Sequence, residues 1–456
     1  MCRKVDEPRV ALRRPVATLG AMLTRLLASA AAATTLALST PALAALSPAE
    51  QKMVQSIDAE HDRTVAMLAK WVEVNSGTMN FEGVRAVGEM LRQELEPLGF
   101  TTRWADESGA DRAGHLIAYH KGKGKKLLLI GHLDTVFEKS SPFQHWTVKS
   151  QDVAEGPGSI DDKGGMAVIV AALRAMKAAG TLKNADITVV LSGDEEDAGN
   201  PVSISRADLI REGKRADIAL DFEPLAVRDG QDMGSTARRS SGSWTVTTKG
   251  QSGHSSGIFS SDSGYGAVYE MARILDQFRS QLLEENLTYN VGLVTGGATA
   301  ELQDGGLKGV STGKTNIIAG TAIARGDLRA LTQDQIDRTH AKMQAIVSHS
   351  LPGTSATIAF DPGDYPPMAP TAGNRAILTK LNGVNRDMGL PEMGELPASD
   401  RGAGDISFVA ADVDSLAGMG ASGGGSHAAG ETVDIPSIDK QAKRTAILLT
   451  RYSRER

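Results

Sequence analysis

Acidic and imidazole side chains occur in five short motifs of this sequence, three of which directly follow an apolar run. In chain order the motifs are GHLDTV (131–136), GPGSIDDKGG (156–165), SGDEE (192–196), DFEP (221–224) and GSH (425–427). Carboxylates and imidazoles are the side chains that bind divalent metals and transfer protons in proteins. The five motifs therefore predict a metal or acid–base site, provided that the fold brings them together.

The carboxylates of these motifs could not stand close together without a cation. They are Asp134, Asp161, Glu195, Glu196 and Glu223. Crowded carboxylates repel one another and take up protons, and the motifs supply only His132, His427 and Lys163 as companions. Two divalent ions would resolve this conflict, and a ligand set of carboxylates with one imidazole for each ion suits zinc. In His132-x-Asp134 both side chains point to one face of a strand, so Asp134 can orient the ring of His132.

The elements that must position these motifs are apolar strands that alternate with helices. Strands are predicted at 126–130, 187–191 and 218–220, and helices at about 48–74, 82–97, 166–179 and 205–213. This alternation is typical of an α/β fold with a mostly parallel sheet flanked by helices. In such a sheet ligands bind beyond the carboxyl ends of the strands, which is where three of the motifs lie.

After Gly230 the pattern changes to that of a smaller domain. Strands are expected at 243–248, 287–294, 317–331 and 356–360, and helices at 266–282 and 333–350. Their order, β-α-β-β-α-β, predicts a ferredoxin-like domain inserted into the larger one. We therefore predict a catalytic domain in two parts, residues 45–235 and 363–456, and an inserted domain at 236–362.

The first 44 residues are predicted to be a signal peptide. A basic start at 22–25 (MLTR), an alanine-rich apolar run, and small residues at Ala42 and Ala44 indicate cleavage after Ala44, with translation starting at Met1 or Met22. The apolar run is short for a membrane span, so we expect a periplasmic or secreted protein without a stable membrane anchor. The one cysteine, at position 2, would leave with the signal, which fits an oxidising compartment.

The composition excludes several other classes. Of the 456 residues 41% are hydrophobic, which excludes a wholly disordered chain. There are 49 Lys and Arg against 55 Asp and Glu, a formal charge of −6, and this argues against nucleic acid as a partner because phosphate binding needs clustered cations. A single cysteine also excludes a disulfide framework and a cysteine metal cluster.

As an ordered set, the five motifs resemble those of the dinuclear-zinc exopeptidases related to aminoacylase, succinyl-diaminopimelate desuccinylase and glutamate carboxypeptidase. GPGxxDDKGG and FEP are most similar to the bacterial glutamate carboxypeptidases, and the resemblance covers nearly all of the chain after residue 44. It implies two zinc ions, or cobalt or manganese in their place, bridged by Asp161, with Glu195 as general base and Asp134 orienting a ligand. The other ligands that it implies are His132 and Glu223 on one ion and Glu196 and His427 on the other.

The same resemblance implies that the inserted domain provides contacts of a homodimer and part of the substrate site, through His254, Asn316 and Arg329. His254 would stabilise the oxyanion, and the guanidinium of Arg329 would hold a substrate carboxylate. The expected activity is that of a metallopeptidase or amidohydrolase that releases a C-terminal amino acid, with glutamate as one candidate. Its substrate would be a small peptide or an N-acyl amino acid, attacked by metal-activated water.

Two alternatives stay open at this level. An exported binding or scaffold protein could keep this fold without catalysis, although neither a ligand nor the base is missing. Residues 253–257 (GHSSG) match the G-x-S-x-G pattern of serine hydrolases, but a turn-rich stretch follows them instead of a helix. The chain also departs from the family at Ala319, where a proline is usual, at HAAGE (427–431) in place of HSxxE, and at a run near 301–313 that looks inserted. These departures lie near the expected substrate pocket, so they bear on the substrate rather than on the metals.

Overall fold

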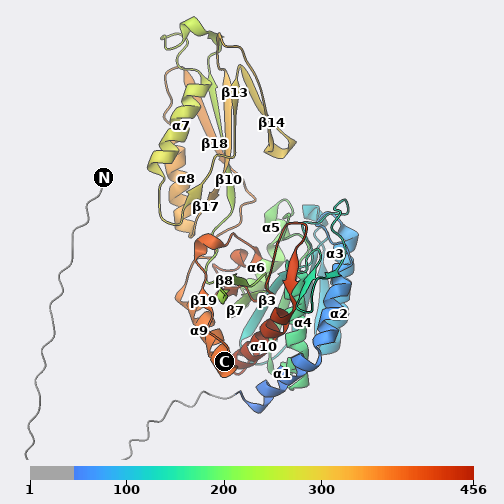
Figure 1. Cartoon of the computed structure of the whole chain (residues 1–456). Coiled ribbons are helices and arrows are strands. Elements are labelled where there is room, and N and C mark those ends of the chain that lie inside the picture. Colours follow the sequence, from blue (N-terminus) through green and yellow to red (C-terminus); the bar gives the residue numbers. More distant parts are fainter. Residues whose placement is uncertain (1–45, 456) are drawn as a thin grey trace, which may run out of the picture. The chain divides into compact units, whose positions relative to one another are not determined.

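A six-stranded mixed sheet forms the centre of the larger domain in the computed structural model, which describes residues 46–455 (Figure 1). Its strands, in spatial order, are β1 (Thr101–Ala105), β2 (His115–His120), β6 (Asp186–Ser192), β3 (Lys126–His132), β7 (Ile218–Asp221) and β20 (Ser415–Ala417). Strands β6, β3, β7 and β20 are parallel to one another, and β2 is antiparallel to both of its neighbours, β6 and β1. The predicted α/β fold is confirmed, and the parallel part of the sheet is the part that carries the motifs.

Strand β3 is buried on both faces, which explains its uninterrupted apolar sequence. Leu127 and Leu129 belong to the larger apolar core, and Leu128 and Ile130 belong to a smaller core on the other side. Successive residues of a strand point to opposite faces, so the two cores lie on the two faces of the sheet.

Helices supply the rest of both cores. The helices of this domain are α1 (Pro48–Ala59), α2 (His61–Val72), α3 (Phe81–Leu95), α4 (Lys163–Ala178), α5 (Val202–Ser205), α6 (Ala207–Gly213), α9 (Ala372–Asp387) and α10 (Ile435–Tyr452). The larger core includes residues of α1, α2, α3, α4, α9 and α10, and the smaller one includes Leu209 of α6. Helix α4 is buried along nearly its whole length because α1, α2, α10 and β3 all contact it.

The single helix expected at 48–74 is wrong, because the chain forms two helices there. The capping box at Ser47 and Glu50 starts α1 as expected, but the helical path is interrupted at Glu60 (φ −101°, ψ 10°). Next to the break, Nδ1 of His61 lies 2.7 Å from a carboxylate oxygen of Asp439 in α10. No glycine or proline marks this position, so the sequence carried no signal for the break.

The smaller domain has the expected β-α-β-β-α-β order. Its elements are β10 (Gly242–Gly250), α7 (Ala267–Gln281), β12 (Thr288–Tyr289), β13 (Leu293–Gly297), β17 (Thr321–Arg329), α8 (Gln333–Val347) and β18 (Thr354–Phe360). Strand β17 pairs with β12, β13 and β10, and β10 pairs with β18, all antiparallel. Helices α7 and α8 pack on one face, where Trp244 and Phe278 meet edge to face. The expected strand at 287–294 is thus divided into β12 and β13.

Several short strands complete the description. In the smaller domain they are the hairpin β14 (Thr299–Gln303) and β15 (Lys308–Thr312), and the pair β11 (Gly253–His254) and β16 (Ile317–Ile318). In the larger domain they are β4 (Thr147–Val148), β5 (Val153–Glu155), β8 (Ala226–Arg228), β9 (Gln231–Gly234), β19 (Gly394–Glu395), β21 (Gly423–Gly424) and β22 (Thr432–Asp434). The run near 301–313 that looked inserted is therefore one strand-turn-strand unit.

Two connections join the domains, and they run side by side as a short antiparallel ribbon. Ser241 pairs with Tyr365, and Arg238 pairs with Met368. Each pair exchanges two backbone hydrogen bonds, of 2.8 and 3.1 Å for the first pair and 2.9 and 3.0 Å for the second. We call residues 238–241 and 365–368 the connecting ribbon. The sheet of the smaller domain begins at Gly242 and ends at Phe360, and the limits 236–362 stay a prediction.

No helix within residues 46–455 is long and apolar enough to cross a membrane. The predicted signal peptide lies outside the described residues.

Candidate metal and catalytic site

The register of the parallel strands brings three motifs to one edge of the sheet. His132, the last residue of β3, is level with Ser192, the last residue of β6, and Ile130 is level with Asp221 at the end of β7. The residues that follow each strand must therefore leave the sheet at the same edge. This convergence places GHLDTV, SGDEE and DFEP around one site.

Asp161 lies between the two histidines. Its Oδ1 is 3.0 Å from Nε2 of His132, and its Oδ2 is 3.3 Å from Nε2 of His427. Nε2 of His427 is also 3.0 Å from Oε2 of Glu196. Ligand atoms of His132, Asp161 and Glu196 all lie within 4.8 Å of one another. Each oxygen of Asp161 thus faces a different imidazole, as a carboxylate that bridges two ions would.

The charges around this cluster favour positive ions. Burial by itself lowers the pKa of His132, but hydrogen bonds to Asp134 and Asp161 outweigh it and raise the pKa well above its usual value. Hydrogen bonds to Asp161 and Glu196 raise the pKa of His427 to about 11. Oε1 of Glu196 is buried and has no hydrogen-bond partner among the described residues. Two imidazoles, a shared carboxylate and a free carboxylate oxygen fit the donor set of a dinuclear site for zinc or a similar ion.

Asp134 links the first histidine to the loop that carries the two glutamates. Its Oδ1 lies 3.3 Å from Nδ1 of His132, and its backbone carbonyl lies 3.1 Å from the same nitrogen. The two carboxylate oxygens also accept the backbone N–H groups of Glu195 and Glu196, at 3.0 and 3.1 Å, and Thr78 donates its hydroxyl at 2.7 Å. Burial raises the pKa of Asp134, but these contacts outweigh it, so the pKa is lowered and the group stays ionised. Asp134 therefore orients both a ligand and the loop beside it.

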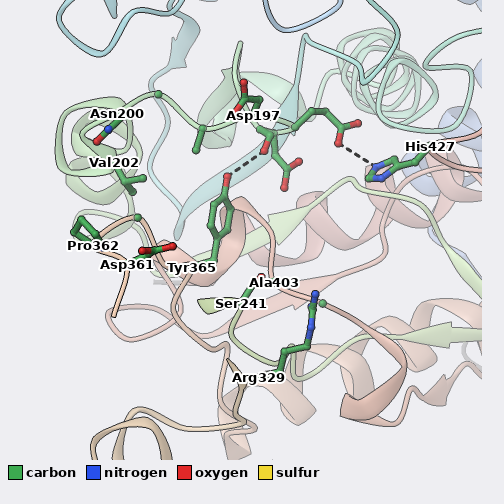
Figure 2. Close-up of a pocket in the computed structure, with 16 residues that line it drawn as sticks. Asp197, Asn200, Val202, Ser241, Arg329, Asp361, Pro362, Tyr365, Ala403 and His427 are labelled. Carbon is green, nitrogen blue, oxygen red and sulfur yellow. Dashed lines mark hydrogen bonds and ion pairs between the residues drawn. The ribbon is translucent and has the colours of Figure 1, made fainter. Parts of the chain in front are cut away.

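Glu195 lines a cavity of about 700 Å³ next to the cluster (Figure 2). Glu196, His427 and Arg329 line the same cavity. Burial raises the pKa of Glu195 well above its usual range, and the nearby charge of Glu223 adds to the effect. A carboxylate with a raised pKa can accept a proton and later return it, which a general base and acid must do.

Glu223 lies near this site but is held by arginines. Its Oε2 is 2.8 Å from Nη2 of Arg238 and 3.9 Å from Nη1 of Arg401. Arg238 also contacts Asp221 at 3.0 Å. The structure thus brings four of the five expected ligands together and pairs the fifth, Glu223, with Arg238 of the connecting ribbon.

The three expected substrate residues of the smaller domain lie in two places. Arg329, the last residue of β17, lines the cavity (Figure 2). Its Nε is 3.2 Å from a carboxylate oxygen of Asp327. His254 and Asn316 do not line the cavity; both are exposed, and the backbone of Asn316 accepts a hydrogen bond from Ser255 next to His254. The chain therefore assembles only part of the expected substrate site around its own cavity.

Several residues that support the site were not identified from the sequence. Oε1 of the buried Glu431 accepts the backbone N–H of Ile160 at 2.9 Å and of Asp161 at 3.3 Å, and so fixes the loop of the shared carboxylate. Burial raises the pKa of Glu431 to about 8. His115 accepts the N–H of Gly193 at 3.1 Å. Glu431 stands at the end of HAAGE, so that motif could have indicated it, whereas His115 reaches the site because β2 is antiparallel.

The serine hydrolase alternative finds no support in this geometry. Gly253–His254 is a short strand of the smaller domain, and a single turn follows at Ser255–Gly257. The ring of His254 contacts Ser256 rather than Ser255, and His427 faces Asp161 and Glu196. A serine nucleophile needs a base within hydrogen-bond reach, and Ser255 has no such histidine partner among the described residues.

The structure combines a mixed α/β sheet, a cluster at its carboxyl edge that could hold divalent ions, and an inserted βαββαβ domain, and these features are those of a two-domain metallohydrolase. The chain belongs to Peptidase family M20/M25/M40, whose model matches residues 128–451. This confirms the resemblance seen in the motifs.

Curated relatives and solved structures agree with this assignment. The chain is 37% identical over 183 residues to carboxypeptidase G2 of Pseudomonas sp. (strain RS-16), covering 39% of this chain and 42% of the relative. It is 33% identical over 181 residues to succinyl-diaminopimelate desuccinylase of Novosphingobium aromaticivorans, covering 37% of this chain and 46% of the relative. These two alignments span less than half the length of either relative. The structure of a tripeptidase from Staphylococcus aureus has a similar fold, with a TM-score of 0.65 at 18% identity, covering 87% of this chain and 99% of that one.

Proposed function

We propose that this protein is a metal-dependent hydrolase that releases a C-terminal amino acid from a small peptide or an N-acyl amino acid. The observation that carries the proposal is the position of Asp161 between the imidazoles of His132 and His427, with Glu195 on the adjoining cavity. Membership of a peptidase family supports amide hydrolysis. The names of the two relatives, a carboxypeptidase and a desuccinylase, support an amide bond next to a carboxylate-bearing group.

Different residues of the site would bind the metal ions, transfer the proton and bind the substrate. His132, His427, Asp161 and Glu196 would hold two divalent ions, which supply a Lewis acid and lower the pKa of water. The carboxylate of Glu195 accepts the proton of the attacking water and returns it to the departing amine. The carboxylate of Asp134 keeps Glu195 in place by accepting the backbone N–H of Glu195. The guanidinium of Arg329 holds the carboxylate of the substrate in the same cavity.

The test is the variant Glu195→Gln, which keeps the shape of the side chain but cannot take up a proton. We expect metal analysis to find about two divalent ions in each chain of both wild type and variant, with zinc, cobalt and manganese measured separately. The kcat on a panel of dipeptides and N-acyl amino acids should fall about 10³-fold or more in the variant. A chelator should abolish the wild-type activity, and the added metal should restore it.

Glu392→Gln is the matched control, because Glu392 is a half-exposed carboxylate that pairs with Arg386 away from the cavity. Its kcat should equal that of the wild type. Full activity of Glu195→Gln, or activity that resists chelation, would contradict the proposal. A well-folded, metal-loaded chain without hydrolytic activity on any such substrate would favour the binding or scaffold protein instead.

We also propose that the protein works as a homodimer in which His254 and Asn316 serve the site of the other copy. Their exposure, and their absence from the cavity that Arg329 lines, support this arrangement. Mixing the inactive variants Glu195→Gln and His254→Ala should then restore activity, because one of the two sites in a mixed dimer has both residues intact. A chain that stays monomeric in analytical ultracentrifugation, or mixtures without regained activity, would exclude it.

Export is a further part of the proposal. The basic start, apolar run and Ala42-x-Ala44 pattern support a signal peptide that is cleaved after Ala44. N-terminal sequencing of the protein recovered from the periplasm or the medium should begin at Ala45. Protein that stays in the cytoplasm with residues 22–44 attached would contradict it.

A further inference from the structure

The backbone of the proposed base, Glu195, is held from two sides by two different parts of the chain. Its N–H donates to Oδ1 of Asp134 at 3.0 Å. Its carbonyl oxygen accepts the hydroxyl of Tyr365 at 3.0 Å (Figure 2). Asp134 follows the central strand of the sheet, whereas Tyr365 belongs to the connecting ribbon between the domains. The peptide groups on either side of the Glu195 Cα are therefore fixed by the sheet on one side and by the ribbon on the other.

A buried arginine fixes the direction of the Tyr365 hydroxyl. Nη2 of Arg206 donates to Oη of Tyr365 at 2.9 Å. Because a guanidinium has no acceptor, the hydroxyl must accept from Arg206 and can donate its one hydrogen only to Glu195. The guanidinium also lies 5.7 Å from the ring centre of Tyr365. The hydrogen bond to the carbonyl of Glu195 therefore has a defined direction.

Arg206 is itself tied to the same loop. It contacts Oδ1 of Asp194 at 2.6 Å and the carbonyl of Asp194 at 2.9 Å, and it meets Oδ1 of Asp405 at 2.8 Å. Its side chain is 1% exposed, so these contacts are shielded from water. A buried network of charged hydrogen bonds is rigid when its donors are paired, so these contacts hold Arg206 in a fixed position.

The ribbon strand that carries Tyr365 is fixed in turn by its partner strand. Tyr365 and Ser241 exchange two backbone hydrogen bonds of 2.8 and 3.1 Å. Arg238, at the other end of the ribbon, contacts the carboxylate of Glu223 at 2.8 Å. The ribbon thus contacts the loop of the proposed base through Tyr365 and an expected metal ligand, Glu223, through Arg238.

We propose that Tyr365 is a positioning residue that holds the peptide of Glu195 in place from the connecting ribbon, with its hydroxyl oriented by Arg206. The inference rests on the proposed function only for the role of Glu195 as a base. The connecting ribbon then has two roles, because it joins the two domains and also positions the base.

The test is Tyr365→Phe in the full-length, metal-loaded protein. This change removes the hydroxyl and keeps the ring between Arg206 and Phe408, so the variant should fold, with a melting temperature within about 5 °C of wild type. We expect kcat to fall about tenfold with KM within about twofold, because a shifted base slows proton transfer without removing a substrate contact. Hydrogen exchange of the amides in residues 193–199 should become about fivefold faster.

Tyr289→Phe is the matched control. The hydroxyl of Tyr289 also donates to a backbone carbonyl, that of Phe278 at 2.9 Å, but within the smaller domain. This variant should leave kcat and the exchange of residues 193–199 unchanged. Equal kcat and equal exchange in Tyr365→Phe and wild type would overturn the inference, as would equal effects of the two variants. The exchange measurement needs no activity, so it decides the inference even if the proposed function fails.

Discussion

The two domains of this protein place their functional side chains in opposite surroundings. In the larger domain, His132, Asp134 and Asp161 are largely shielded from solvent and bonded to one another at the edge of a parallel sheet. In the smaller domain, His254 and Asn316 are exposed, and the side chain of Arg329 is 35% exposed. Parallel strands gather the residues that follow them at one edge, whereas the strand ends of an antiparallel sheet lie at both edges. The larger domain therefore gathers most of the candidate metal ligands by itself, whereas the smaller domain presents His254, Asn316 and Arg329 with part or all of the side chain accessible to solvent.

The largest loss of activity is expected from neutralising Asp161, the carboxylate that contacts both histidines. Asp161→Asn leaves a neutral amide between His132 and His427, so both ions should be lost and activity should fall at least about 10³-fold. Metal analysis and kcat measurements check this. Asp217→Asn is the control, because Asp217 lies at the opposite end of the same strands and accepts the N–H of Lys126 at 2.8 Å. If Asp161→Asn kept both ions, like Asp217→Asn, metal binding would not depend on the carboxylate at the carboxyl edge of the sheet.

An intermediate effect, on KM, is expected from changes to Arg329 of the smaller domain. Arg329→Ala should raise KM about 10- to 100-fold for substrates with a free C-terminal carboxylate and change kcat less, because a charged hydrogen bond is lost. The KM of Arg329→Lys should lie between those of the wild type and Arg329→Ala, since an ammonium cannot form the two parallel hydrogen bonds of a guanidinium. Substrates with an amide in place of that carboxylate should be nearly unaffected. Arg279→Ala, on the exposed face of α7, serves as the control. A fall in kcat at constant KM would place Arg329 in the chemistry rather than in binding.

The effect that bears least on activity concerns stability and pH in the metal-free protein. Burial raises the pKa of Glu431 and of Asp221 to about 8, so the folded state binds more protons than the unfolded state between about pH 5 and 7. The free energy of unfolding should therefore fall as pH rises through this window, by up to about 1.4 kcal/mol per pH unit for each carboxyl. Above it, Lys163 opposes the trend, because burial lowers its pKa to about 7.

Thermal melts in chelator at pH 5, 6 and 7 measure this effect, and the midpoint should drop by about 5 °C or more across the range. Bound metal should flatten the dependence, because the positive charge of ions held beside Asp161 favours the ionised form of neighbouring carboxyl groups. Hydrogen exchange should locate the change in the larger domain. Stability that rises from pH 5 to 7 in chelator would mean that the acid cluster is not strained without metal.

The sequence predicted which acidic and imidazole side chains lie together better than it predicted the groups around them. His132, Glu195 and Glu196 could be found because each lies at or just beyond the end of an apolar strand, and strand ends converge in an α/β sheet. Tyr365 and Arg206 gave no such signal, since they meet the base loop through contacts between segments far apart in the chain. The pairing of Glu223 with Arg238 could not be predicted either, because it depends on contacts between the connecting ribbon and the residues at the end of β7.

The fold followed the same rule. Strands and long helices with a regular apolar pattern were predicted, including the βαββαβ order of the smaller domain. The break at Glu60 was not predicted, because no glycine or proline marks it. The gap between β12 and β13 was also missed, although Gly292 lies in it and an isolated glycine within a strand pattern indicates an irregularity. Local sequence indicates that an element exists, whereas its interruptions depend on packing.

The side-by-side connections also bear on how such a chain can be taken apart. Since Arg238 and Met368 are hydrogen-bonded neighbours, the polypeptide leaves the larger domain and re-enters it at a single point. A gene encoding residues 46–238 joined by a short glycine turn to 368–455 would close that point without stretching any strand of the main sheet. Residues 239–367 therefore form one continuous segment whose two ends meet, and removing it would leave both ends of the larger domain within hydrogen-bond distance of each other.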